Sequence, residues 1–155
     1  MPFLVCLLCA DQWLKWLVRT RMVPGDSIPL IHGVLHLTYV QNTGAAFGVL
    51  RHTGPLLVLI SFVVIVVLTS ALRQAQHERG ESWSARLRRY GMILMLAGAM
   101  GNVVDRLWLG YVVDFVDLRV WPVFNLADSA ISVGIGLWLW SLLQEARSAS
   151  SGRRS

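Results

Sequence analysis

The sequence has few charged residues for its length. Of its 155 residues only 15% are Asp, Glu, Lys or Arg, whereas 55% are hydrophobic and the mean hydropathy is +0.55. Soluble domains average about 25% charged residues. This shortage argues against a soluble enzyme, a disordered protein and a nucleic-acid-binding arm, so we expect no nucleic acid partner. The composition indicates a protein that lies in a lipid bilayer.

Cysteine is nearly absent as well. Cys6 and Cys9 are the only two, and both lie in the first apolar run, so they predict neither a disulfide framework nor a zinc site. Their spacing favours two small buried hydrophobic side chains over redox chemistry. His32 and His36 lie in a strand-like segment, where four residues of separation keep the side chains far apart. The sequence therefore predicts no metal and no cofactor.

Four apolar segments can cross a membrane as helices. The clearest covers residues 54–72 without a charge, close to the roughly 20 residues that span the hydrocarbon. The others are predicted at about 2–18, 90–107 and 126–143. A cleaved signal peptide fits the first segment poorly, because it lacks a basic start and has Asp11 and Lys15 where a cleavage site would lie.

The fold class predicted is an integral membrane protein, mainly α, with four transmembrane helices and a small extracytoplasmic β-sheet. Residues 26–49, between the first two helices, show partial period-two alternation and predict two or three short strands. Residues 108–124 are expected to form a short loop. We predict one domain over residues 1–146, followed by a disordered polar tail at 147–155.

Arginine counts predict the orientation, because cytoplasmic loops are enriched in Lys and Arg. Five arginines fall on the side of residues 26–49. The other side has eight: Arg73, Arg79, Arg86, Arg88, Arg89, Arg147, Arg153 and Arg154. This bias places both termini and the 73–89 loop in the cytoplasm.

Several charges fall inside the predicted spans, where each is costly and suggests a functional site. Asp11 and Lys15 are four residues apart and share a helical face. Spacing alone favours an ion pair at the membrane interface, with Lys15 extending toward water. Asn102, Asp105 and Arg106 also share a face, where they can hold one another and Arg106 can neutralise Asp105.

Two further aspartates suggest chemistry. Asp114 and Asp128 lie at opposite ends of one short connection at the outer membrane boundary, so they can meet. Two carboxylates a few ångströms apart share a proton, and one can then activate water while the other protonates a carbonyl. Solvated surface charges are the commoner explanation for two loop aspartates. Asp117, in the same loop, is expected to be solvated.

Four motifs in order make the chain similar to one family, the bacterial lipoprotein signal peptidases. They are DQWLK at 11–15, QNTGAAFG at 41–48, GNVVDRLWLGYVVDF at 101–115 and FNLADSAI at 124–131. The resemblance implies an aspartyl endopeptidase of the bacterial inner membrane with its site on the extracytoplasmic side. It also implies diacylglyceryl-modified prolipoproteins as substrates, cleaved just before the lipidated cysteine.

The resemblance also implies roles for individual residues. Asp114 and Asp128 match the family's catalytic aspartates, and polar support around them falls on Asp11, Lys15, Asn42, Asn102, Asp105, Arg106 and Asn125. Membrane lipid is the surrounding partner, the expected oligomeric state is a monomer, and the antibiotic globomycin is the expected type of inhibitor.

Two other classes of protein compete with this interpretation. An ion-coupled transporter also carries membrane carboxylates and a lone lysine, but it predicts charges near the midplane and repeated halves, and the sequence has no internal repeat. A non-catalytic scaffold leaves the aspartates and asparagines of the motifs unexplained.

Overall fold

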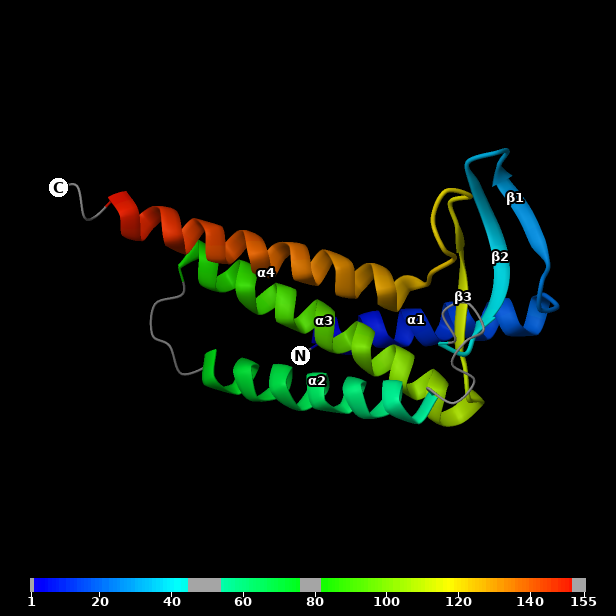
Figure 1. Cartoon of the computed structure of the whole chain (residues 1–155), viewed down its shortest axis with the longest axis horizontal. Helices are drawn as coiled ribbons and strands as arrows, with labels where there is room; N and C mark the ends of the chain where they lie inside the picture. The colour runs from blue at the N-terminus through cyan, green and yellow to red at the C-terminus, as the bar shows by residue number, and fades with distance from the viewer. Residues whose placement is uncertain (1, 45–53, 76–81, 152–155) are drawn as a thin grey trace.

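The computed structural model describes residues 2–44, 54–75 and 82–151. Four helices lie lengthwise, and a small sheet stands across one end of them (Figure 1). The helix α3 contacts each of the other three helices. The helices are α1 (Pro2–Arg21), α2 (Gly54–Ala75), α3 (Trp83–Leu109) and α4 (Leu126–Ser151).

Glycines let the backbones of α3 and α4 touch. A Cβ on Gly91 would lie 2.6 Å from the carbonyl oxygen of Gly134, and one on Gly98 would overlap the carbonyl oxygen of Ala127. Real Cβ atoms do not approach that closely, so only glycine allows this packing. The contact holds the first turn of α4, with Asp128, against the middle of α3.

Within the described residues, three helices are long and apolar enough to cross a membrane. They cover Pro55–Ala75, Trp83–Leu109 and Leu126–Ser148. The first helix, which we also predicted to span, is not among them. Its mean hydropathy is lowered by four charged residues, Asp11, Lys15, Arg19 and Arg21.

The sheet has three antiparallel strands in the order β1 (Ser27–Ile31), β2 (Leu35–Asn42) and β3 (Val112–Asp117). The first two lie in the predicted β-region, whose residues 45–49 fall outside the described ranges. The third corrects our prediction of a loop at 108–124. Its sequence, VVDFVD, is rich in residues that favour strands, and it pairs with β2 over Asn42↔Val112 to His36↔Asp117.

An apolar cluster joins the sheet to the end of α1. Val18 of α1 and Met22, just after that helix, pack with Tyr39 of β2 and with Val113 and Phe115 of β3, and all five are buried. This packing fixes β3, and therefore Asp114, relative to α1.

The last helix continues further than expected. Residues 147–151 are helical, so the prediction of a disordered tail from 147 is wrong for them. No Gly or Pro occurs between Gly136 and Gly152, and Ser148 Oγ donates to the Gln144 carbonyl within the helix. The remaining tail residues, 152–155, lie outside the described part of the chain.

The third helix likewise begins at Trp83 rather than near residue 90. Ser82 caps it, since its side chain accepts a hydrogen bond from the backbone N–H of Ala85 and so satisfies one free donor of the first turn. Arg86 stacks over the Trp83 ring at 5.4 Å, which is close enough for a cation–π contact.

Candidate active site

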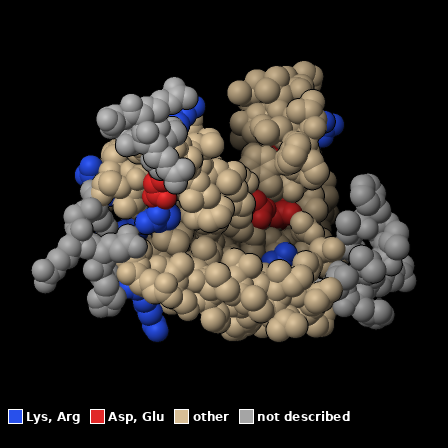
Figure 2. All heavy atoms as spheres, turned by 60° about the vertical axis from the view of Figure 1, so that its left-hand side comes forward, with Lys and Arg blue, Asp and Glu red and all other residues tan. Residues whose placement is uncertain are grey.

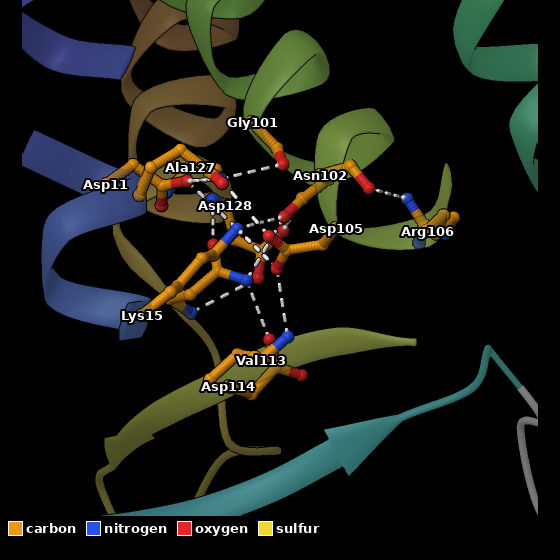
Figure 3. Close-up of polar contacts among 12 residues, drawn as sticks. Asp11, Lys15, Gly101, Asn102, Asp105, Arg106, Val113, Asp114, Ala127 and Asp128 are labelled. Atoms are coloured by element: carbon orange, nitrogen blue, oxygen red, sulfur yellow. Dashed lines mark hydrogen bonds and ion pairs between the residues drawn. The ribbon is translucent and has the colours of Figure 1, made fainter. Parts of the chain in front are cut away.

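Two carboxylates meet where the sheet joins the helices. Asp114 comes from β3 and Asp128 from the first turn of α4, and Figure 3 shows both beside Asn102 and Asp105 of α3. Asn125 connects them, because its Nδ2 donates to Asp114 Oδ1 at 2.7 Å and its backbone N–H donates to Asp128 Oδ2 at 3.2 Å. Asp114 is buried, whereas Asp128 is partly exposed. The structure thus brings the predicted pair together through one bridging residue.

The start of α4 fixes the position of Asp128. The Asn125 Oδ1 atom accepts from the backbone N–H of Asp128 at 2.9 Å, while Asp128 Oδ2 accepts from the backbone N–H of Asn125. This reciprocal pattern is a capping box, with Asn125 as the N-cap and Asp128 three residues on. A carboxylate in this position also interacts favourably with the positive end of the helix dipole.

Asp114 lies in a site that favours its protonated form. Burial raises the pKa of Asp114 to about 6; the hydrogen bond that Asn42 Nδ2 donates at 2.8 Å opposes this rise, and the nearby charge of Asp128 adds to it. A carboxyl group with such a pKa can hold or release a proton close to neutral pH.

Lys15 is the centre of a buried charge cluster behind the two aspartates. Its Nζ lies 2.9 Å from Asp11 Oδ2, 3.0 Å from Asp105 Oδ2 and 3.0 Å from Asn102 Oδ1. An ammonium group has three donors, and these three partners use all of them. The predicted ion pair between Asp11 and Lys15 is present. Both residues are only 2% exposed, so the prediction that Lys15 extends toward water is wrong.

The lysine also sets the orientation of Asn102. Because the ammonium has no acceptor, the oxygen of the Asn102 amide must face it. The other end of the amide, Nδ2, therefore faces Asp128 and donates to its Oδ1 at 2.8 Å. A continuous line of hydrogen bonds runs from Lys15 through Asn102 to Asp128 (Figure 3).

The same cluster ties separate elements together. Asp11 Oδ1, on α1, accepts the backbone N–H of Ala127 in the first turn of α4 at 2.9 Å. Asp105 Oδ2, on α3, accepts the backbone N–H of Val113 in β3 at 3.0 Å. Each carboxylate thus anchors the element that carries one of the two site aspartates. Gly101 makes room for Asp11, since a Cβ there would lie 2.6 Å from Asp11 Oδ2.

Our reading of the sequence missed Gln12. Its Nε2 lies 3.1 Å from Asp11 Oδ2, from Asp105 Oδ1 and from the Gly101 carbonyl, so it completes the cluster on the side away from Asp128. A signal was available, because Gln12 is a polar residue inside an apolar segment and directly follows Asp11.

Two predicted roles need correction. The ion-pair partner of Asp105 is Lys15 rather than Arg106, whose Nη1 donates to the Asn102 carbonyl at 3.4 Å. Asp117 is buried instead of solvated, because it accepts from Thr38 Oγ1 at 2.8 Å and from the backbone N–H of Arg119 at 2.8 Å. These hydrogen bonds lower the pKa of Asp117, and the one from the Arg119 backbone has the largest effect.

Figure 2 shows acidic side chains at the back of a hollow in a mostly uncharged surface, with a basic side chain on the opposite wall. Arg106 lies near this region, since the charges of Asp128 and Asp114 act on it and it lines a groove with Pro55 and Val58 of α2. In the described ranges, no group of three or more His, Cys, Asp or Glu is close enough to hold a metal ion.

Comparisons with known proteins show which proteins this chain is similar to. A family model described as signal peptidase (SPase) II matches residues 3–144. A lipoprotein signal peptidase of Moorella thermoacetica is 45% identical over 149 residues, which cover 94% of this chain and 95% of the relative. One of Halothermothrix orenii is 42% identical over 142 residues, covering 88% and 90%.

A solved structure is also similar. The structure of a bacterial membrane enzyme at 2.3 Å resolution superimposes with a TM-score of 0.80 at 30% identity, and the match covers 92% of this chain and 86% of that one.

Proposed function

Since the chain belongs to the signal peptidase II family, we propose that Asp114 and Asp128 are the catalytic pair with which it removes signal peptides from lipoproteins. The observation that carries the proposal is the bridge through Asn125. It holds one buried and one partly exposed carboxylate together near the sheet end of the helices. The two different environments suit a pair in which one carboxyl is protonated and the other ionised.

The proposed reaction needs only these two groups and a water molecule. The ionised carboxylate takes a proton from water, whose oxygen attacks the scissile carbonyl carbon, while the protonated carboxyl gives its proton to the carbonyl oxygen. The carboxyl that received the water proton then protonates the leaving nitrogen as the C–N bond breaks. The gem-diol returns a proton to the other carboxylate as it becomes the product acid, and the pair regains its starting state.

We propose diacylglyceryl-modified prolipoproteins as the substrates, with cleavage just before the lipidated cysteine. Asp128 lies in the first turn of α4, a helix long and apolar enough to cross a membrane, so a lipid-modified segment can approach it from the bilayer. Asn42 and Asn125 border Asp114, and their amides are suited to orient a peptide backbone.

The proposed topology has four spans, with α1 as the fourth. Its two interior charges are paired within the protein: Asp11 and Lys15 lie 2.9 Å apart and both are buried. Such pairing lowers the cost of charge in the hydrocarbon, so mean hydropathy alone underrates this helix. Four spans place both termini on one side, and the arginine bias makes that side the cytoplasm of a bacterial inner-membrane protein.

A cleavage assay tests the function. Purified protein should cut a diacylglyceryl-modified prolipoprotein and leave the unmodified precursor intact. Cleavage should continue in EDTA and after treatment with serine-directed reagents, and globomycin should block it. Loss of cleavage in EDTA with recovery on adding a divalent metal would contradict the aspartyl mechanism but not the substrate.

The pH dependence should be bell-shaped. At low pH both carboxyls are protonated, so neither can accept a proton from water. At high pH both are ionised, so neither can donate a proton to the carbonyl oxygen. Because the pKa of Asp114 is raised to about 6, kcat/KM for the lipidated substrate should fall as the pH rises through this region. A rate that stays constant from pH 5 to 9 would be incompatible with a shared proton.

Cysteine labelling tests the topology. In a variant without Cys6 and Cys9, a cysteine at Val34 in the β1–β2 turn should react with an impermeant thiol reagent in intact cells. A cysteine at Ser84, at the start of α3, should react only after the membrane is opened. The reverse pattern would overturn the orientation and the location of the site.

A further inference from the structure

A groove between α1 and α3 lies behind the charge cluster, outside the proposed catalytic pair. It has a volume of about 200 Å³, and its walls include Trp16 and Arg19 from α1 and Trp108 and Leu109 from α3. Gln12 and Asp105 also line it. The groove therefore borders the residues that hold the site together, but neither Asp114 nor Asp128 lines it.

The two tryptophans indicate the depth of the groove in the bilayer. Trp16 is 55% exposed and Trp108 is 84% exposed, and each lies near the sheet end of its helix. Exposed tryptophans on membrane helices gather at the interface between hydrocarbon and water. The mouth of the groove thus lies at the level of the lipid headgroups.

Arg19 gives the groove an unbalanced positive charge. It is exposed, and Asp105, the carboxylate that lines the same groove, pairs with Lys15. Arg19 interacts with the Tyr111 hydroxyl: the hydrogen bond to Tyr39 raises the pKa of Tyr111, and Arg19 opposes that rise. A guanidinium at headgroup depth matches a phosphate, which it can bind with two parallel hydrogen bonds.

A second hollow continues the groove along α3. It is lined by Val104, Leu107 and Trp108 and shares Val104 and Trp108 with the first. Its lining is almost entirely apolar, as an acyl chain requires. The charged mouth matches the headgroup of a phospholipid, and the apolar extension behind it matches an acyl chain.

We propose that this groove binds one glycerophospholipid of the outer leaflet, with its phosphate on Arg19 and an acyl chain along Val104 and Leu107. The inference goes beyond the proposed function, because it concerns a structural lipid and not the substrate. Through Gln12 and Asp105, a lipid in this place braces α1 against α3 and stabilises the cluster around Lys15.

Thermal unfolding in a neutral detergent tests the site without any cleavage assay. Added phosphatidylglycerol should raise the Tm of the wild type in a saturable way. Arg19→Gln should weaken this apparent affinity by about tenfold or more, since a hydrogen bond to a charged group is lost. Arg21→Gln, on the same helix but lining a different groove, should respond like the wild type.

Other ligands distinguish the sources of the effect. Diacylglycerol with the same chains should give less than half the rise in Tm, and inorganic phosphate should give none. The proposal is overturned if Arg19→Gln responds fully, if diacylglycerol alone gives the whole rise, or if free phosphate replaces the lipid.

Fluorescence provides a readout of position. Phosphatidylglycerol with brominated chains should quench tryptophan emission, and Trp108→Phe should reduce the quenched fraction. Equal quenching in this variant and the wild type would place the lipid elsewhere.

Discussion

Asp128→Asn and Asp114→Asn are each expected to lower the cleavage rate by roughly 10³-fold or more while the protein stays folded. General acid–base catalysis contributes about 10²–10⁴-fold, and an amide can neither accept the proton of water nor supply one as a carboxylic acid does. Asparagine preserves the shape of the side chain and its hydrogen bonds to the Asn125 backbone or Asn42 in part, so the Tm should change little. The measurement is single-turnover cleavage of lipidated prolipoprotein beside a melting curve.

Asp117→Asn is the matched control. Asp117 lies three residues from Asp114 in the same strand, but its partners are Thr38 and Arg119 on the sheet. Its loss should weaken the sheet slightly and leave most of the turnover. Near-normal turnover in Asp128→Asn, or an equal loss in Asp117→Asn, would show that the pair is assigned wrongly.

Local patterns in the sequence predicted the helices, because a helix depends on residues close together in the chain. They only suggested Asp114 and Asp128 as a pair, and the resemblance to the family singled the two out. The uncharged run at 54–72 needs no tertiary contact to be recognised. The strand β3 was missed since six residues between two helices look like a loop, although Val112, Val113, Phe115 and Val116 favour a strand. Only pairing with β2, about 70 residues earlier, makes the strand visible.

The burial of Lys15 could not be predicted for a similar reason. Spacing shows that Asp11 can reach it, but Asp105 and Asn102 come from a helix some 90 residues later in the chain. A lysine with one partner reaches water at the membrane surface, whereas a lysine with three can stay inside. The number of acceptors, which depends on the packing of α1 on α3, decides between the two outcomes.

Lys15→Met should accordingly lower the free energy of unfolding by about 3–5 kcal/mol, because it leaves Asp11 and Asp105 buried without their shared cation. Arg88→Met is the comparison: it breaks the pair with Glu145 at 2.7 Å, whose side chains are 24% and 40% exposed. Such a pair contributes under about 1 kcal/mol. Denaturation in mixed micelles measures both, and equal losses would contradict a buried cluster.

Replacing Asp11 and Asp105 as well as Lys15 separates the effect on stability from the effect on catalysis. Lys15→Met combined with Asp11→Asn and Asp105→Asn should recover much of the lost stability, because no unpaired charge remains in the protein. Activity should stay low all the same. Without the ammonium, the Asn102 oxygen keeps the hydrogen bond from Asn125 Nδ2 at 3.2 Å but loses the one from Lys15, so the amide is held less firmly and its hydrogen bond to Asp128 is weakened. Recovery of stability and turnover together would mean that Lys15 serves only the fold and that Asn102 needs no lysine to orient it.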